Sequence, residues 1–449
     1  MVEAAIFVVF SGGILWLLVR EHRSRRKRWE EAAQACGLHL VEGDAGWRAQ
    51  VRARAGMVSV RIEAFGDKGR ETRIVIEAPA PPDFQSVTIR PELPLRLGRE
   101  IEVGDRYFDD AFFLEGPARL LLALLDAETR RLLVELKEKS TLSITSGELR
   151  AVVSGDEKVA EVLRPLLDVC KRFAPPMDLV QRLVENATGD PDPGVRLQNL
   201  LFLIRELSWN PETDRALRKA CSDPLPEIRL RAGRQLGAEG RGVLLELAET
   251  LEEDAVSAEA LSVLERELTF ERLEGILGLA LRRRRLQTAH ACLESFGRRG
   301  GAAAVALLAK VLEREYGELA PIAATALGAT GNPAAEPSLI QALERDDRDV
   351  QVAAAVALGR AGSPAAVLPL KEAAERSPRL DLELRRAARQ AIAEIHSRVQ
   401  GASPGQLSLA AAEAGQLSLA GAEAGQLSLA HDATGQLSLG GEEDPEAVP

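Results

Sequence analysis

The sequence predicts a mainly α-helical protein with an N-terminal transmembrane helix, a small α+β domain, an α-solenoid of helical pairs and a disordered C-terminal tail. Three patterns support this prediction. An uncharged apolar run opens the chain, segments of period two follow it, and an alanine-rich phrase then recurs at intervals of 28 to 34 residues. The 449 residues accordingly divide into an anchor with its basic flank at 1–28, an α+β domain at 29–155, a repeat solenoid at 156–398 and an acidic tail at 399–449.

The first segment is a candidate membrane anchor. Residues 4–19 carry no charge, although these 16 residues fall short of the about 20 that a helix needs to cross a hydrocarbon core. Six basic residues follow at 20–28, and such a cluster stays on the cytoplasmic side. These features predict contact with the lipid bilayer through residues 4–19, a single pass through the inner (plasma) membrane, an outward N-terminus and a cytoplasmic remainder. The alternatives are a cleaved signal peptide, which carries basic residues before its apolar run, and a peripheral or buried helix.

Residues 29–155 alternate between strand and helix patterns. A short helix is expected to end at Gly37, and period-two segments at 47–54, 57–65 and 71–78 predict strands, the last two joined by a glycine-containing turn. The remaining predicted elements are short strands at 86–93 and 104–116, one amphipathic helix at 120–136 and a hairpin that turns near Gly147.

Two groups of residues in this domain are of types that can bind a metal ion or take part in acid–base chemistry. Asp105, Asp109 and Asp110 lie close together, but turn and helix-cap roles explain them without metal or acid–base chemistry. Cys36 and His39 have a ligand-like spacing, yet a structural zinc needs four ligands and no second pair occurs. The chain also lacks a phosphate-binding loop, a nucleophile elbow and a zinc-protease motif, so we predict no enzyme activity and no cofactor.

A ten-residue phrase recurs in the second half of the chain, at 228–237, 319–328 and 350–359. Counting weaker copies, equivalent positions fall at residues 203, 236, 264, 296, 327, 358 and 392. Such a period is typical of stacked helical pairs, in which each pair is stable only against its neighbours. We expect alanines such as Ala357 to allow close helix packing, and we expect Gly328 and Gly359 to end their helices with a positive φ.

The phrase, which runs from Asp347 through Val350 and two alanines to Leu358-Gly359, resembles the short bacterial HEAT repeats. The resemblance is best at 317–361, good at 223–250 and weak at 255–300. It implies a helical binding scaffold. Some relatives are bilin lyases or metal-dependent hydroxylases, but the hydroxylases carry His-Glu pairs that this sequence lacks, and no bilin-lyase residue can be assigned.

One basic cluster in the array is a candidate partner-binding site. It comprises Arg282, Arg283, Arg284 and Arg285, with Arg298 and Arg299 nearby. Nucleic-acid binding requires many phosphate contacts, and the neighbouring glutamates and the net charge of −11 argue against it. A helix C-terminus or a solvated ridge is the simpler interpretation, and an acidic protein partner is the remaining one.

The tail repeats one hexapeptide three times at ten-residue spacing, and a fourth copy differs only in its last residue, Gly440 in place of alanine. It holds seven acidic residues, no Lys or Arg and no Phe, Trp or Tyr from 401 onward, so it is expected to be disordered. The copies resemble an array of weak docking motifs, which gain avidity from linkage. The alternatives are sliding-clamp docking, although the aromatic anchor of that motif is absent, addition to a sheet edge, and duplication of a neutral linker. The candidate contact residues are Gln406, Leu407, Leu409, Gln416, Leu417, Leu419, Gln426, Leu427, Leu429, Gln436, Leu437 and Leu439.

Together these features predict a membrane-anchored cytoplasmic scaffold that binds protein partners through its solenoid and its repeated tail motif. The partner's identity does not follow from the sequence. One alternative is an enzyme or small-ligand-binding protein that uses residues 29–155. Another is a weak sliding-clamp or nucleic-acid-associated protein.

Overall fold

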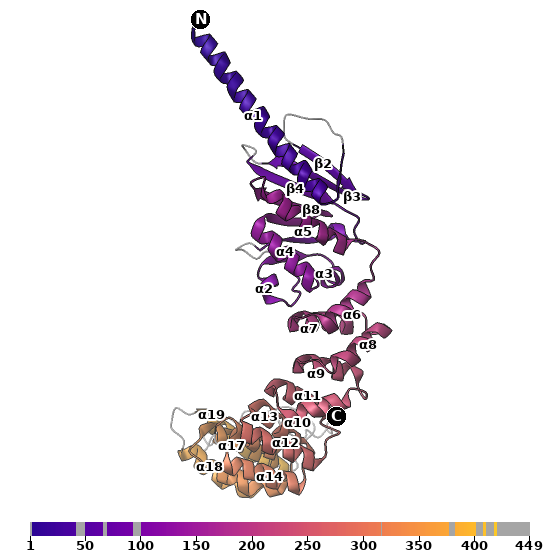
Figure 1. Cartoon of the computed structure of the whole chain (residues 1–449). Coiled ribbons are helices and arrows are strands. Elements are labelled where there is room, and N and C mark those ends of the chain that lie inside the picture. The colour runs from indigo at the N-terminus through magenta and orange to yellow at the C-terminus, as the bar shows by residue number, and fades with distance from the viewer. Residues whose placement is uncertain are drawn as a thin grey trace, which may run out of the picture. The chain divides into compact units, whose positions relative to one another are not determined.

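The computed structural model describes residues 2–41, 50–65, 70–92, 100–315, 317–376, 382–400, 407–409 and 417–419, with side chains between residues 19 and 398 of those ranges. The chain divides into two compact units, Met1–Val243 and Leu244–Pro449 (Figure 1). The first unit therefore holds the predicted α+β domain together with the first helices of the predicted solenoid.

An eight-stranded antiparallel sheet forms the centre of the first unit. Its strand order is β1-β2-β3-β4-β8-β7-β5-β6, so β4 pairs with a strand that lies about seventy residues later in the chain. The strands are β1 His39–Leu40, β2 Gln50–Ala55, β3 Val58–Phe65, β4 Glu71–Glu77, β5 Thr88–Pro91, β6 Phe112–Glu115, β7 Thr141–Thr145 and β8 Glu148–Ser154.

The period-two pattern correctly predicted which side chains are buried in β3. In β3, Val60 and Ile62 alternate with polar residues and lie in the core as predicted, whereas in β4 Ile74, Val75 and Ile76 are all buried. The predicted hairpin is also confirmed: β7 and β8 are joined by Ser146 and Gly147, whose φ values of 52° and 79° match the twist of antiparallel strands.

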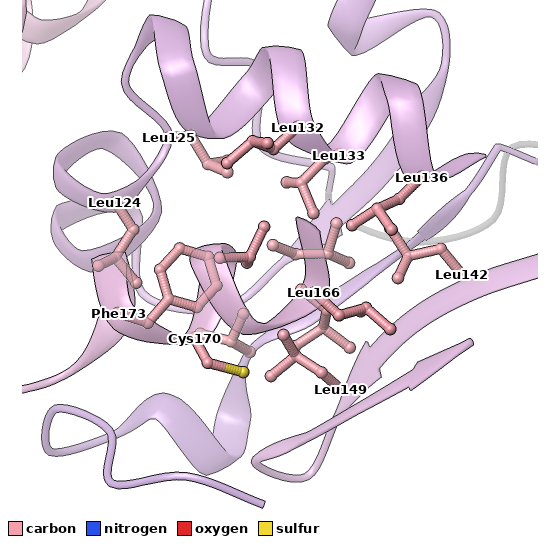
Figure 2. Packing of buried hydrophobic residues seen from close by; sticks show 14 of the residues in the cluster. Leu124, Leu125, Leu132, Leu133, Leu136, Leu142, Leu149, Leu166, Cys170 and Phe173 are labelled. Atoms are coloured by element: carbon pink, nitrogen blue, oxygen red, sulfur yellow. The ribbon is translucent and has the colours of Figure 1, made fainter. Parts of the chain in front are cut away.

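Helices cover one face of this sheet. They are α1 Val2–Ala35, α4 Ala127–Lys139 and α5 Lys158–Phe173. The one-turn helix α2 Arg106–Asp109 precedes β6, and α3 Ala118–Leu124 follows β6 and packs on the helices at 179–206. Figure 2 shows leucines of α4 meeting Leu166, Cys170 and Phe173 of α5 and the sheet residues Leu142 and Leu149. Burial raises the pKa of the Cys170 thiol to about 12, so this cysteine is a packing residue.

Two predicted elements of this domain differ from the structure. The segment expected to be one helix at 120–136 is two helices, because Asp126 accepts a hydrogen bond from the Thr129 amide at 2.9 Å and starts α4 as its N-cap. The segment expected to be a strand at 104–116 holds the helical turn α2 before β6, because Asp105 caps that turn in the same way.

The N-terminal prediction requires a larger correction. A single helix, α1, replaces the predicted anchor and separate short helix, and its second half packs into the core of the first unit, where Trp29 and Ala33 are fully buried. Among the described residues no helix is long and apolar enough to cross a membrane, which contradicts the transmembrane helix predicted within residues 1–28. The uncharged run is short, and the same helix continues into a charged segment whose Arg25 pairs with Asp156 at 2.8 Å. Side chains before Val19 lie outside the described residues, and the predicted localisation remains a prediction.

Helices make up the rest of the chain up to residue 400, within the residues that the structure describes. In the first unit they are α6 Leu179–Gly189, α7 Pro193–Glu206, α8 Pro211–Ala220 and α9 Pro226–Leu236. Thereafter they are α10 Arg241–Thr250, α11 Asp254–Leu264, α12 Phe270–Arg283, α13 Leu286–Arg299, α14 Gly301–Arg314, α15 Leu319–Ala329, α16 Glu336–Ala342, α17 Arg348–Ala361, α18 Val367–Arg376 and α19 Leu382–Gln400. All seven repeat positions fall on odd-numbered helices, from α7 to α19, which confirms the period.

The odd-numbered helices of the second unit pack directly on one another from α11 to α19. The predicted role of Gly328 and Gly359 is wrong. Both lie inside their helices, and neither has a positive φ. A Cβ at Gly328 would lie 2.6 Å from the Cβ of Ala357, and a Cβ at Gly359 would lie 3.0 Å from the Cα of Ala391. These glycines allow neighbouring helices to touch, and we call the pairs Gly297–Ala326, Gly328–Ala357 and Gly359–Ala391 the glycine–alanine ladder.

The structure describes two short segments of the tail that was expected to be disordered. Leu407–Leu409 and Leu417–Leu419 form the strands β9 and β10, which pair antiparallel with Ser408 opposite Ser418. The first two copies of the hexapeptide are therefore extended over these residues. The other tail residues, including Gln406, Gln416 and the third and fourth copies, lie outside the described residues.

Candidate functional site

The main candidate site is a groove between α12 and α14 in the second unit. Its volume is 560 Å³, and its apolar floor consists of Phe270, Leu277 and Leu281 from α12 with Leu307 and Val311 from α14. We call this site the α12–α14 groove. Its dimensions and lining are those of a surface that binds an apolar side chain or a short segment of another molecule.

Charged residues form the rim of the α12–α14 groove. Glu274 lies on α12, Lys310 and Arg314 lie one helical turn apart on α14, and Glu315 follows directly. Within the described part of the chain neither Lys310 nor Arg314 is engaged in an ion pair, and both are exposed. The rim therefore offers two cations to a ligand.

A second hollow of 350 Å³ adjoins the α12–α14 groove on the side of α16. Ala306 and Lys310 line both hollows, and Ser338 and Gln341 of α16 line the second one. Neighbouring depressions thus lie on both sides of α14, one toward α12 and one toward α16.

The packing of the odd-numbered helices accounts for these depressions over the even-numbered helices. The glycine–alanine ladder brings the odd helices into backbone contact, whereas the even helices carry bulkier residues such as Leu307 and Lys310. Phe270 is held in place by an edge-to-face contact with the buried Phe296 of α13, with 4.9 Å between the ring centroids. This part of the groove floor is therefore fixed to the core of the array.

The structure gives most of the predicted basic cluster a structural role. Arg283 and Arg285 donate hydrogen bonds to the carbonyl oxygens of Thr250 and Glu252, over 2.8 and 3.2 Å. Arg299 likewise donates to the carbonyl oxygen of Leu268 at 2.8 Å. These contacts satisfy free carbonyl groups near the C-terminal ends of α10 and α11.

Arginine side chains also donate hydrogen bonds to main-chain carbonyl oxygens further along the second unit. Arg345 donates to the carbonyl oxygen of Glu315 at 2.9 Å, and Arg398 donates to that of Gly362 at 2.7 Å. Arg298 instead pairs with the carboxylate of Glu265 at 2.6 Å. In the contacts with carbonyl oxygens, donor and acceptor are 30 to 36 residues apart in the chain, which is about one repeat. Arg282 and Arg284 are exposed at the end of α12. Partner binding by these two arginines, and by the tail motif, remains a prediction.

The acidic group of the first unit also has structural roles. The carboxylate of Asp109 accepts hydrogen bonds from the amides of Val103 and Gly104 at 3.0 and 2.9 Å. Asp105 accepts the amide of Phe108 and pairs with Arg130 at 2.9 Å. These contacts agree with the expected turn and cap roles.

Arg130 is the centre of a buried network that the sequence did not reveal. Its guanidinium donates two hydrogen bonds of 2.9 Å to the carboxylate of Asp190, and it also contacts Asp105 and the carbonyl oxygen of Leu125. Burial lowers the pKa of Arg130, but the hydrogen bonds that it donates to the two aspartates and their negative charges outweigh this effect and raise the pKa overall. The network ties α4 to the loop between α6 and α7.

The raised pKa of Asp109 predicts that the stability of the first unit depends on pH. Burial raises the pKa of Asp109 to about 6, although its two backbone hydrogen bonds act in the opposite direction. Because the folded pKa lies above the unfolded value, the folded state binds more protons, and its stability decreases as the pH rises through about 6. Asp109→Asn should remove this contribution. Urea denaturation followed by tryptophan fluorescence tests the prediction, and an identical pH dependence in wild type and variant would contradict it.

Cys36 and His39 do not form a metal site within the described residues, and neither do His290 and Cys292 of the second unit. His39 is exposed on β1 and Cys36 is half-buried, with burial raising the pKa of its thiol. In the second unit, burial raises the pKa of Cys292 to about 12, while His290 lies on the surface beside Glu294. The described part of the chain contains no group of three or more His, Cys, Asp or Glu residues arranged to hold a metal ion.

The stacked helical pairs define a class of protein, the α-solenoid repeat proteins, here combined with an α+β domain. The comparison with protein families is consistent with this class. A family model of HEAT repeats matches residues 305–393, so the chain carries HEAT repeats over this segment. The copies expected at 223–250 and 255–300 lie outside the match.

The comparisons with individual proteins add little. No curated protein matches the chain. A solved structure of human deoxyhypusine hydroxylase in complex with glycerol is 18% identical and covers 48% of this chain and 96% of that one, with a TM-score of 0.22. At this TM-score the likeness supports no argument about function.

Proposed function

We propose that this protein is a scaffold that binds a protein partner through the α12–α14 groove. The HEAT repeats favour this class of function, because stacked repeats present an extended surface rather than an enclosed pocket. The observation that carries the proposal is the apolar floor beside the exposed cations Lys310 and Arg314. The proposed occupant is an amphipathic helix of the partner, with apolar side chains on the floor and a carboxylate near the two cations.

A charge-reversal variant tests this proposal. Lys310→Glu with Arg314→Glu changes only exposed side chains, so the fold should persist while the affinity for an acidic amphipathic partner decreases about tenfold or more. Arg360→Glu with Lys371→Glu is the matched control, because it changes the same charges on α17 and α18. Partners are captured from the source cells with wild-type protein, and the affinity of each purified partner is then measured by isothermal titration calorimetry.

The outcomes separate the groove from other surfaces. A partner that loses affinity for the groove variant and keeps its affinity for the control supports the proposal. Equal affinity for all three proteins would contradict binding at the α12–α14 groove. Failure to find any purified protein that binds directly would contradict the scaffold function itself.

A further inference from the structure

A second surface lies in the first unit, on the face of the sheet opposite α1 and α5. Residues of β2, β3 and β4 that point away from the core line a hollow of 610 Å³ there. The helices that the structure describes pack on the other face, which buries Val60 and Ile62. We call this surface the open sheet face.

Strand register places a row of arginines across the open sheet face. Arg52 of β2 lies directly opposite Arg61 of β3, Arg61 lies opposite Val75 of β4, and Val75 lies opposite Arg150 of β8. Two like charges in directly opposite positions repel each other and cost stability. Val75 is nevertheless only 4% exposed, which is consistent with the aliphatic stems of the flanking arginines covering it.

Within the described residues, the arginines of this row differ in how far nearby carboxylates neutralise them. Arg150 pairs with Glu148, and Arg73 of the neighbouring row pairs with Glu63 at 3.3 Å. At the other end, Arg52 has no ion pair within the described residues. The Nε atom of Arg61 lies 3.9 Å from Glu63 and makes no hydrogen bond in the part of the chain that the structure describes. Positive charge therefore remains beside the hollow.

We infer that the open sheet face is a docking site for an acidic peptide segment of a partner protein. A carboxylate between Arg52 and Arg61 would accept hydrogen bonds from both guanidinium groups and remove their mutual repulsion. The 74% exposed side chain of Met57, which lines the same hollow, provides an apolar contact. This site is separate from the α12–α14 groove and does not depend on it.

The charge pattern favours a peptide over a nucleic acid. Glu63, Glu77 and Glu148 lie among the arginines on the same face, and they would repel a continuous line of phosphates. A peptide, in contrast, can place single carboxylates opposite Arg52 and Arg61 and uncharged residues opposite the glutamates. The surface therefore fits a ligand with spaced negative charges.

Fluorescence anisotropy with the full-length protein tests this inference. The probe is a fluorescein-labelled peptide of alternating glutamate and valine. Wild-type protein should bind it with an affinity that decreases as the salt concentration rises. Arg52→Glu with Arg61→Glu should weaken binding about tenfold or more. Arg205→Glu with Arg215→Glu should not, although it makes the same change of charge on the exposed surface of α7 and α8.

Three results would overturn the inference. These are no peptide binding at low salt, an equal loss of affinity in the control variant, or tighter binding of a single-stranded oligodeoxynucleotide through Arg52 and Arg61. Circular dichroism and tryptophan fluorescence first establish that each variant is folded. The groove variant Lys310→Glu with Arg314→Glu should keep its affinity for the peptide, which separates this inference from the proposed function.

Discussion

Arg130→Leu is expected to destabilise the first unit by about 3–5 kcal/mol, because it leaves a buried carboxylate without its partner. The Asp190 side chain is 1% exposed and receives two hydrogen bonds from the Arg130 guanidinium. Water cannot replace those hydrogen bonds at so buried a position. Urea denaturation of the full chain followed by tryptophan fluorescence measures the loss, since the four tryptophans, at 16, 29, 47 and 209, belong to the first unit.

The neighbouring residue provides the control for this prediction. Arg131 is 59% exposed and pairs with Glu128 and Glu135 on the helix surface, so Arg131→Leu should change the stability little. The double variant Arg130→Leu with Asp190→Leu should be more stable than Arg130→Leu alone, because no unpaired carboxylate stays buried at position 190. Equal stability losses for Arg130→Leu and Arg131→Leu would show that the buried network contributes nothing.

Gly328→Ala is expected to destabilise the second unit, whereas Gly275→Ala is expected to stabilise it. The new Cβ at position 328 would lie 2.6 Å from the Cβ of Ala357, so α15 and α17 must move apart at a cost of about 1–3 kcal/mol. Gly275 lies inside α12 with no atom within 4 Å of the new Cβ, so alanine there gains about 0.5–1 kcal/mol of helix stability. The same chemical change thus has opposite signs at two helical positions.

Hydrogen exchange measured by mass spectrometry distinguishes the two variants. Peptides from α15 and α17 should lose protection in Gly328→Ala, because each helical pair is stabilised by its neighbours. Gly328→Leu should extend that loss to α13 and α19. Unchanged protection of α17 in Gly328→Ala would contradict close packing at the glycine–alanine ladder.

The sequence predicted local structure best where a pattern repeats along the chain. Alternating residues identified the strands β2, β3 and β4 and the buried faces of the first two, and the recurring phrase identified the odd-numbered helices. It failed where one side chain decides the outcome locally: Asp126 divides a continuous leucine-rich pattern into α3 and α4. It also failed for residues 1–28, where apolar composition was interpreted as a transmembrane helix.

The sequence contained the residues of both candidate surfaces without indicating that they meet. Arg52 and Arg61 share the open sheet face because β2 pairs with β3 in one particular register. Phe270 and Val311 share the α12–α14 groove because two helices separated by α13 stack in space. Neither relation is a property of spacing along the chain.

The sequence by itself determined the period of the helical array, the alternation of the strands and the position of the hairpin turn, since each depends on residues that are close in the chain. Only the tertiary structure decided the role of Gly328, the partner of Arg130 and the location of the grooves. From the sequence alone, Gly328 could either end a helix or allow two helices to pack in close contact. Which of the two it serves depends on whether Ala357, on the next odd helix, lies against it.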